Sequence, residues 1–435
     1  MPPVQYGSVS GESPLSAMTS TKYDVLVAGG GSAGVAAAVG AVQAGAHTLL
    51  VEQGPFLGGA ATRASVLTYC GLFTQADPPE LAVAGVAAQV LDRIRAFGFA
   101  TDFIRSRRTG NVVIALDPEA VKFALDQLVT QPGLDVLLYA NVSASHQEHG
   151  LITGVTCTSP SEPVTVRAGA FVDATGDATL ATLAGVPQVD VRAPRMPGTL
   201  MIRIGGVDEL HPLPSPDEVA QAIRGERRRS DAYLACDRVH LLRLPQSQDL
   251  LLSAADETVD GLNAHSLTGA EMSGRRQAWS YLDALRRGVR GFENAYLVST
   301  GPYLGIRQTR LVMGLAEITD DHVRAACLSP TGVARGAWPI ERHPRPGQVS
   351  YEPIRNLAYY HIPYDALRTT GPDNLWISGR AIPAEAGAYS SLRVMGTAFA
   401  TGHAAGVAAA SWLAQGRQHD VPEVLVQLAK QGALL

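Results

Sequence analysis

Three glycines near the start of the chain have the spacing that a bound dinucleotide requires. Gly29, Gly31 and Gly34 form a G-x-G-x-x-G pattern, and Glu52 follows after about twenty residues. In such a pattern the first glycine permits a tight turn, the second lets a pyrophosphate approach the backbone, and the third lets a helix pack closely on a strand. Free N–H groups at the start of that helix would hold the phosphates, and Glu52 would accept hydrogen bonds from ribose hydroxyls.

This chemistry requires the surrounding segment to fold as strand, turn, helix and strand. Residues 25–27 are a β-type apolar run, residues 35–44 are rich in alanine, Gly45 stands where a helix C-cap belongs, and residues 48–51 form a second apolar run. The uncharged stretch 25–51 is also long enough to cross a bilayer, but three glycines at one turn disfavour a membrane span. A purely structural strand–helix–strand unit is the other alternative.

The composition is that of a globular protein without an evident polyanionic partner. The chain has 435 residues, 46% of them hydrophobic and 17% charged, with a net charge of -5. These values indicate neither nucleic-acid binding nor attachment to a membrane. The four cysteines lie far apart without C-x-x-C spacing, so we expect no metal site and a reducing, cytoplasmic location. Residues 1–20 lack the features of a secretion signal and are predicted to be a flexible tail.

The two ends of the chain share a Gly/Ala-rich composition that the middle lacks. Residues 191–350 contain Pro-rich connectors between amphipathic helices, whereas the segment "NLWISGRAIPAEAGAYSSLRVMGTAFATGHAAGVAAA" returns to the Gly/Ala-rich character of the beginning. We therefore predict an α/β fold in which residues 21–190 and 351–435 form a doubly wound, Rossmann-like domain. An α+β substrate region, residues 191–350, is inserted between them.

Several blocks, in the same order along the chain, resemble the FAD-dependent oxidoreductase family. They include "AGGGSAG", "LGGAAT", "FVDATGDATLATLAG", "GIRQTRLVMG" and the Gly/Ala-rich segment near the end. This family is part of the glutathione-reductase-like superfamily and is distantly similar to the fumarate reductase and succinate dehydrogenase flavoproteins. The fingerprint alone does not separate FAD from NAD, but the resemblance implies FAD. Because no histidine is placed for covalent attachment, we expect non-covalent binding.

The fingerprint and the resemblance together predict the residues that contact FAD. They are Gly29, Gly31, Ser32, Ala33, Gly34, Glu52, Gln53, Gly58, Gly59, Thr62, Val142, Ala174, Thr175, Gly176, Gly379, Arg380, Arg393, Val394, Gly396 and Thr397. By this likeness, residues 58–62 line the pyrophosphate and the isoalloxazine with backbone amides and one hydroxyl. Val142 meets the adenine through its main chain, and residues 174–176 lie near the adenosine.

The last block is expected to reach the reactive end of the flavin. Gly379 and Arg380 correspond to a segment that passes the ribityl and pyrophosphate groups. Gly396 and Thr397 open a helix of small residues, whose N-terminus would stabilise negative charge at the flavin N1–O2 edge. We predict that the small side chains, through Gly402 and Gly406, let this helix approach the flavin. A merely buried Ala-rich helix is the alternative.

Four polar residues in the remaining blocks are candidates for catalysis. Arg307 and Arg310 could clamp an anionic group, or Arg307 could act on a proton as the related fumarate reductases suggest. Their alternative is a pair of helix-surface arginines. His361 and Tyr364 could form a general acid/base pair, although a hydrogen-bonded core histidine is the alternative for His361. The stretch "GAWPIERHP" has only a faint likeness to a flavin halogenase motif and receives no role.

The predicted activity is hydride transfer between flavin N5 and a small polar organic substrate at a C–C or C–O/N bond. An unidentified electron donor or acceptor would complete the cycle. The sequence has neither a second G-x-G-x-x-G unit nor a redox disulfide motif, which disfavours a two-nucleotide reductase. A flavin-dependent monooxygenase and a non-catalytic flavin-binding module remain as alternatives.

Overall fold

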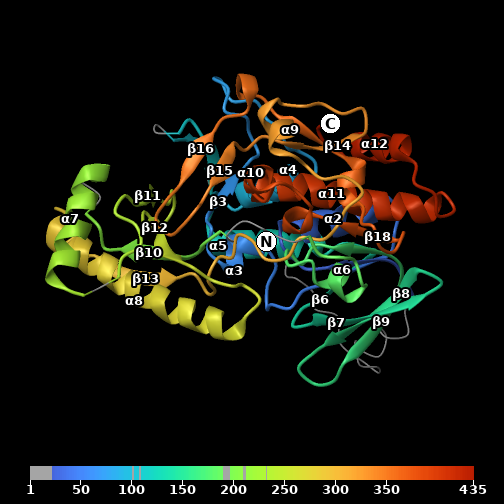
Figure 1. Cartoon of the computed structure of the whole chain (residues 1–435), viewed down its shortest axis with the longest axis horizontal. Coiled ribbons are helices and arrows are strands. Elements are labelled where there is room, and N and C mark those ends of the chain that lie inside the picture. Colours follow the sequence, from blue (N-terminus) through green and yellow to red (C-terminus); the bar gives the residue numbers. More distant parts are fainter. Residues whose placement is uncertain (1–21, 100–101, 107–108, 190–195, 209–211, 232) are drawn as a thin grey trace.

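A parallel sheet lies at the centre of the computed structural model, which describes residues 22–99, 102–106, 109–189, 196–208, 212–231 and 233–435 (Figure 1). Its parallel strands stand in the order β6 (Leu134–Leu137), β2 (Thr48–Val51), β1 (Lys22–Ala28), β9 (Val164–Asp173) and β18 (Leu375–Ile377). Strand β9 also pairs in antiparallel fashion with β8 (Leu151–Thr158), which pairs with β7 (Asn141–Glu148). The predicted tail, residues 1–20, lies outside the described residues.

The strand order reverses at β1, which places a binding crevice after that strand. The chain leaves β1 through the glycine turn, forms α2 (Ser32–Gln43) and returns to β2 on one side, while β9 lies on the other side. Ligands of open α/β sheets bind beyond the carboxyl ends of the strands at such a reversal. This confirms the predicted strand, turn, helix and strand.

The longest helix of the C-terminal part, α11 (Met395–Ala414), packs directly on α2 (Figure 1). A Cβ atom on Gly402 would lie 2.0 Å from the Ala33 carbonyl oxygen, and one on Gly406 would lie 1.9 Å from that of Ala37. Only glycine permits backbones to approach this closely. The small residues at these two positions therefore face α2, which corrects the prediction that they bring α11 close to the flavin.

Shorter elements surround this frame. The helices are α3 (Ala60–Arg63), α4 (Val86–Ala96), α5 (Pro118–Val129), α6 (Thr179–Leu183), α9 (Asp320–Arg324), α10 (Ala386–Leu392) and α12 (Val421–Lys430), with 3-10 turns η1 (Arg355–Leu357), η2 (Tyr364–Leu367) and η3 (Gly379–Ala381). Small antiparallel sheets are formed by β3 (Thr68–Cys70), β5 (Val112–Ala115) and β4 (Phe103–Arg105), by β14 (Gly332–Gly336) and β17 (Tyr360–Pro363), and by β15 (Ile340–Arg342) and β16 (Ser350–Glu352).

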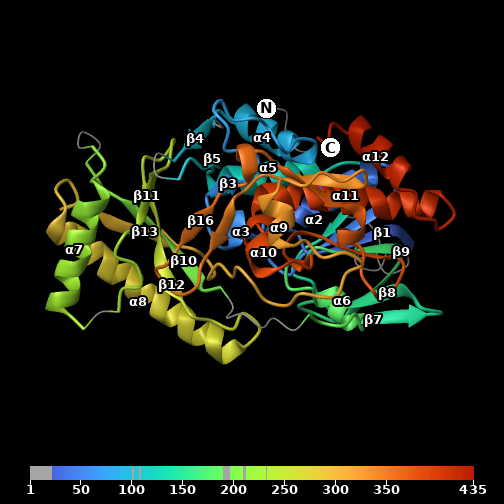
Figure 2. The same ribbon diagram turned by 45° about the horizontal axis from the view of Figure 1, so that its top comes forward.

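A second sheet with its own core stands beside the first (Figures 1 and 2). Its strands follow the order β11 (His240–Arg243), β12 (Leu250–Glu257), β10 (Gly198–Gly205) and β13 (Tyr296–Thr300). The sheet packs against α8 (Ala264–Gly288), and α7 (Pro216–Arg229) packs on α8. Along β10, Leu200, Ile202 and Ile204 join this second core, whereas Met201 joins the larger one. The α/β fold with an additional α+β part is confirmed, while the boundaries at residues 190 and 350 stay predictions.

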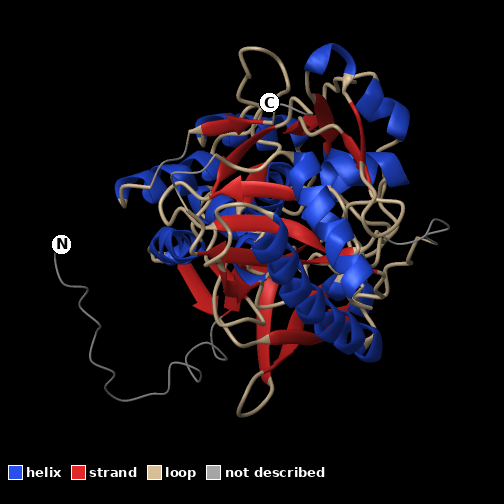
Figure 3. Ribbon diagram, turned by 90° about the vertical axis from the view of Figure 1, so that its left-hand side faces the viewer, coloured by secondary structure: helices blue, strands red, loops and turns tan. Residues whose placement is uncertain are grey.

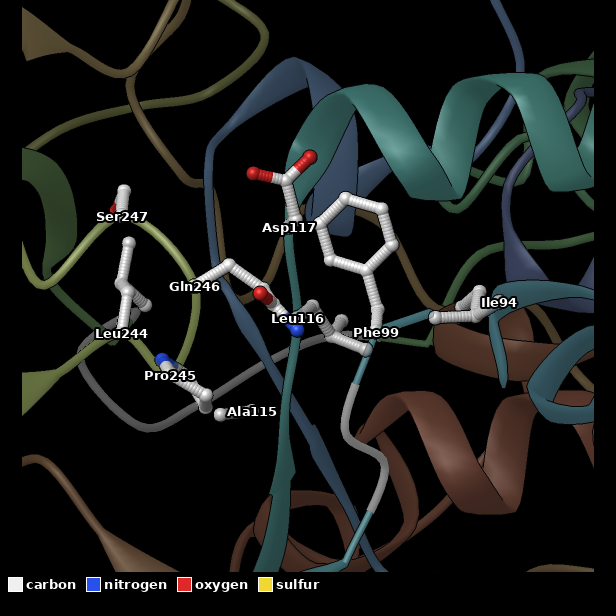
Figure 4. Close-up of a pocket in the computed structure, with 9 residues that line it drawn as sticks. All are labelled: Ile94, Phe99, Ala115, Leu116, Asp117, Leu244, Pro245, Gln246 and Ser247. Atoms are coloured by element: carbon white, nitrogen blue, oxygen red, sulfur yellow. The ribbon is translucent and has the colours of Figure 1, made fainter. Parts of the chain in front are cut away.

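The two parts meet tightly on one side of the molecule (Figure 4). There the 244–247 turn lies against the start of α5, and the Gln246 side-chain amide donates to the Gly98 carbonyl over 3.0 Å. The cavity left between them, about 10 Å³, holds one water molecule at most. Figure 3 shows the strands running through the molecule with helices around them. Within the described ranges, none of the helices has both the length and the apolar character needed to span a bilayer.

Candidate active site

The glycine turn has the shape that the fingerprint predicts. Gly29 has a φ of +98°, and a Cβ atom there would lie 2.6 Å from the Ala174 carbonyl oxygen. A Cβ atom on Gly34 would lie 1.6 Å from the Gly29 oxygen, so the helix can start here only without a side chain. Helix α2 begins at Ser32 with no side-chain cap, which leaves its first N–H groups available to an anion.

The Glu52 carboxylate organises the turn from the end of β2. Its two oxygens accept hydrogen bonds from the backbone N–H groups of Gly30, at 2.6 Å, and Gly54, at 2.7 Å. Each oxygen keeps a second lone pair, so the predicted contact to a ribose remains open. The neighbouring Gln53 is exposed, and the Ala140 N–H donates to the Glu52 carbonyl over 3.0 Å. That bond holds the segment leading to Val142 beside Glu52.

A second glycine loop closes over the first. The Gly58 N–H donates to the Gly30 carbonyl over 2.9 Å, and a Cβ atom on Gly59 would lie 2.8 Å from the Gly31 Cα. The Thr62 hydroxyl donates to the Leu57 carbonyl over 2.7 Å. This hydroxyl hydrogen is therefore used within the loop, while the hydroxyl oxygen can still accept a hydrogen bond, and the predicted contact of Thr62 with the cofactor stays a prediction.

The turn after β9 is held by Asp173, an acid that the sequence analysis did not single out. Its buried carboxylate accepts hydrogen bonds from the N–H and hydroxyl of Thr175 and from the N–H of Ala181. Burial raises the pKa of Asp173, while these hydrogen bonds oppose the shift. Asp173 thus shapes the predicted adenosine segment, in which a Cβ atom on Gly176 would lie 2.5 Å from the Arg380 guanidinium.

Arg310 belongs to this corner and not to a clamp with Arg307. Its Nε donates to the Asp177 carbonyl over 2.8 Å, and Arg380 lies 3.5 Å from the Asp177 carboxylate. The backbone of this corner is therefore held by two arginines. The predicted clamp is corrected, because these partners orient Arg310 toward α6 at the nucleotide end of the site.

The start of α11 completes the predicted cofactor surface. The Gly379 N–H donates to the Thr401 hydroxyl over 3.2 Å, and a Cβ atom on Gly379 would lie 3.2 Å from the Ala33 Cβ. Val394 precedes the helix without a side-chain cap. The Thr397 hydroxyl, in the first turn, is buried and has no partner among the described residues.

These features fit FAD. The uncapped start of α2 offers N–H groups to a pyrophosphate, and the uncapped start of α11 offers them to the flavin N1–O2 edge. The orphaned Thr397 hydroxyl is a buried polar group that a ligand would satisfy. The structure thus brings the predicted segments 29–34, 58–62 and 174–176 together through direct backbone contacts. A Cβ atom on Gly379 would lie 3.2 Å from the Ala33 Cβ and 3.7 Å from the Cβ of Ala398, the residue after Thr397.

A buried group of charged side chains lies next to the start of α11. The Glu341 carboxylate lies 3.4 Å from the Arg393 guanidinium and 3.1 Å from His343 Nε2, and it accepts hydrogen bonds of 2.9 Å from Trp338 Nε1 and the Tyr351 hydroxyl. The His343 contact lacks hydrogen-bond geometry, so Nε2 has no hydrogen-bond partner within the described ranges. We call Arg307, Asp256, Arg393, Glu341 and His343 the charged cluster.

Arg307 joins the charged cluster from the side of the second sheet. Its Nη1 donates to the Pro197 carbonyl and lies 3.9 Å from the Asp256 carboxylate of β12. Asp256 also accepts hydrogen bonds from the Thr199 hydroxyl and the Gly347 N–H. The cluster therefore joins both parts of the molecule at the predicted flavin edge.

Burial and mutual charge set the protonation of this cluster. Burial acts to raise the pKa of Glu341, but the adjacent His343 and Arg393 outweigh it and hold that pKa well below its usual range. Burial and the Arg307 charge lower the pKa of His343, so its ring is neutral near pH 7. Burial also lowers the pKa of Arg307, against the attraction of Asp256, but the guanidinium stays protonated.

The predicted acid/base pair is corrected, since His361 and Tyr364 have other neighbours. His361 Nδ1 bonds to the Ser329 backbone, and its ring stacks on Tyr359. The Tyr364 hydroxyl bonds to His419 Nδ1 over 2.8 Å, and His419 in turn stacks on Trp412. Trp412 lies near the end of α11, about 25 Å from its start at a rise of ~1.5 Å per residue. Both side chains have structural partners away from the charged cluster.

Glu341 and His343 are site residues that the sequence analysis missed. They stand two apart on and beside β15, so they face the same way, and Trp338 precedes them in "GAWPIERHP". A strand that repeats acid and histidine on one face, next to tryptophan, was the available signal. It pointed to no partner, because Arg307 and Arg393 lie far away in the sequence.

Comparisons with known proteins show the family of this chain and its fold. A family model described as FAD dependent oxidoreductase matches residues 24–431. Among solved structures, p-nitrophenol 4-monooxygenase from Pseudomonas putida is 12% identical, with 92% of this chain and 83% of that chain covered and a TM-score of 0.50. A geranylgeranyl bacteriochlorophyll reductase-like protein from Thermoplasma acidophilum is 15% identical, with coverage of 95% and 84% and a TM-score of 0.48. At such identities the likeness concerns the fold. A comparison with curated proteins gave no match.

Proposed function

We propose, from the premise that this chain belongs to the FAD dependent oxidoreductase family, that it transfers hydride between flavin N5 and a small polar organic substrate. FAD is the cofactor, and when bound it supplies the centre that accepts or donates the hydride. The chain itself must bind the substrate beside the ring, exclude water and move the accompanying proton. Non-covalent FAD, an unidentified electron donor or acceptor and a cytoplasmic location are parts of the same proposal.

The charged cluster is the observation that carries this proposal. Its side chains are only 9–14% exposed, it adjoins the start of α11, and it contains two guanidinium groups of which one, Arg393, has an Nε without a partner among the described residues. Arginine binds carboxylates and other polar oxygens through paired N–H groups. The acids Glu341 and Asp256 balance the two arginines, so a substrate need carry only one polar or anionic group to be held by Arg307.

His343 is suited to move the proton. When a C–O or C–N bond is oxidised, the carbon loses a hydride with its electron pair and the neighbouring oxygen or nitrogen loses a proton. A neutral imidazole accepts that proton at a ring nitrogen that faces the substrate, and in the opposite direction it returns it. The Glu341 carboxylate, 3.1 Å from Nε2, stabilises the charged ring that results.

The test separates cofactor binding from turnover. Arg307→Ala should lower the rate at which donor compounds bleach the flavin anaerobically by about a hundredfold or more, because one charge-assisted contact of ~3 kcal/mol is lost. The FAD content should stay near one per chain. Arg238→Ala removes an exposed arginine and should change neither quantity. Equal loss of bleaching and FAD in Arg307→Ala would contradict the assignment.

The anaerobic bleaching assay and a second assay with NAD(P)H in the presence of oxygen together distinguish the two alternatives. NAD(P)H oxidation coupled to hydroxylation of a substrate would identify a flavin-dependent monooxygenase. Bound FAD that no donor or acceptor reduces or reoxidises would identify a non-catalytic flavin-binding module.

A further inference from the structure

An open recess of about 530 Å³ lies outside the charged cluster, between the 109–110 turn and the segment around β16. Its walls include the side chains of Val349, Tyr351, Pro353 and Leu357, with the polar groups of Gln75 and Thr109 at one side. Among the residues that the structure describes, none of those that line it is charged. The size is that of a small-molecule site, and the walls suit an uncharged ligand with an apolar body.

Gln75, one of the residues that line the recess, has a side-chain acceptor without a partner among the described residues. The residue is only 8% exposed, and its Nε2 donates to the Asn111 side-chain oxygen over 2.7 Å and to the Thr109 carbonyl over 3.2 Å. These two bonds fix the orientation of the amide. The Oε1 atom is left buried without a partner among the described residues. A buried acceptor in this state costs free energy unless a ligand or water donates to it.

The backbone of one wall is held in an unusual conformation. Asn356 and Leu357, two consecutive residues other than glycine, have φ values of +59° and +55°. This region is costly for a bulky residue, and such conformations collect at ligand-binding sites, where surrounding structure enforces them. Leu357 nevertheless turns 39% of its surface to the outside, at the edge of the recess.

Two segments lead from the recess to the charged cluster. Tyr351 lines the recess, and its hydroxyl donates to the Glu341 carboxylate over 2.9 Å. Gln75 follows the loop that leaves β3, in which a Cβ atom on Gly71 would lie 2.7 Å from the Val394 side chain at the start of α11. Tyr351 therefore connects the recess directly to the charged cluster, and the 71–75 loop runs from the start of α11 to the recess.

We propose that this recess binds the uncharged, apolar part of the substrate, with an N–H or O–H donor directed at Gln75 Oε1, while the reacting polar end lies in the charged cluster. This inference rests on the proposed function for the identity of the ligand as substrate. It divides recognition between a neutral outer subsite and a charged inner one. The substrate class is thus an amphipathic molecule, and a small fully charged acid would leave the recess empty.

The experiment uses indole as a neutral ring with one N–H donor, and N-methylindole as the same ring without it. Both are titrated into the FAD-loaded protein by ligand-observed NMR, with the flavin absorbance recorded in parallel. Indole should bind about fivefold more tightly, since one hydrogen bond to a neutral acceptor is at stake. Val349→Trp, which fills the recess, should weaken both ligands about tenfold, and Val426→Trp, at an exposed valine of α12, should change neither.

Gln75→Met keeps the length of the side chain and should make the two ligands bind equally. If the Gln75→Met variant fails to fold, the comparison of Val349→Trp with Val426→Trp still shows whether the two ligands bind in the recess. Binding that Val349→Trp leaves unchanged, or no saturable binding, would overturn the recess as a subsite. This outcome differs from failure of the proposed function, which shows as loss of flavin bleaching or of FAD and does not depend on indole. A flavin spectrum that indole leaves unchanged in spite of binding would overturn the link between recess and cluster.

Discussion

The nucleotide half of the site is made of backbone, whereas the substrate half is made of charged side chains. Around the glycine turn, Gly29, Gly34 and Gly59 bring main-chain atoms together at distances that leave no room for a Cβ atom. In the charged cluster, Arg393 contacts Glu341 and Arg307 contacts Asp256 through guanidinium and carboxylate groups. The nucleotide half depends on the absence of Cβ atoms at its glycines, and the substrate half depends on the charges of its side chains. Different substitutions should therefore damage each half.

The largest expected effect is in the backbone half. Gly34→Ala places a Cβ atom 1.6 Å from the Gly29 oxygen, so the turn must open and FAD should be lost, together with about 3 kcal/mol or more of the free energy of unfolding. Gly269→Ala, in an open position of α8, is the matched control and should be neutral or slightly stabilising. Flavin absorbance and denaturant unfolding measure both. A Gly34→Ala protein with full FAD content would contradict this view of the turn.

This division also explains how much could be predicted from the sequence. The glycine turn, α2 and the Glu52 position are local, and each follows from spacing within some thirty residues, so the fold class and the strand–turn–helix unit were predictable. The partners of Glu52 were not, because the sequence does not reveal that Gly30 and Gly54 already occupy its oxygens.

The charged cluster could be predicted only in part. Arg307 was a candidate because it lies in the block "GIRQTRLVMG", which resembles the family. Asp256, Glu341 and Arg393 come from distant segments, which only the packing of the two parts of the molecule brings together. Conversely, His361 has a side chain that could exchange a proton, but its position in the fold gives it a structural role. Its Nδ1 is held by the Ser329 backbone, a contact across thirty-two residues that no local pattern indicates.

Removing one charge should sharpen the contrast between the halves. Glu341→Gln leaves Arg393 buried without its counter-charge, and we expect a loss of about 3 kcal/mol in the free energy of unfolding at pH 7. The lowered pKa of Glu341 means that its contribution is present above the unfolded-state pKa of about 4.3 and is lost as the pH falls through the folded-state value. The difference between variant and wild type should therefore shrink in acid. Denaturant unfolding from pH 7 to pH 3 measures it, and a constant difference would exclude Glu341 as the titrating group.

The next effect concerns the proton transfer that we assign to His343. His343→Gln should slow flavin reduction by an oxidisable donor about a hundredfold, with FAD content retained. Because burial lowers the pKa of His343, the wild-type rate should fall only below the ordinary histidine pKa of about 6.5, and the variant should lose this acidic limb. His265→Gln, at an exposed histidine of α8, is the control. A variant that kept the acidic limb would move the proton transfer to another group.

The smallest expected effect tests whether a residue outside the charged cluster, Tyr364, takes part in the reaction. Tyr364→Phe removes the hydroxyl that bonds to His419 Nδ1 over 2.8 Å and to Trp376 Nε1 over 3.2 Å. Burial raises the pKa of this hydroxyl to about 12, so it cannot exchange a proton readily near neutral pH. We expect a loss of about 1 kcal/mol in the free energy of unfolding, by denaturant titration, and an unchanged rate of flavin reduction. A tenfold lower rate with FAD content unchanged would return Tyr364 to the reaction, and it would require the far end of α11 to act on the flavin from about 25 Å away.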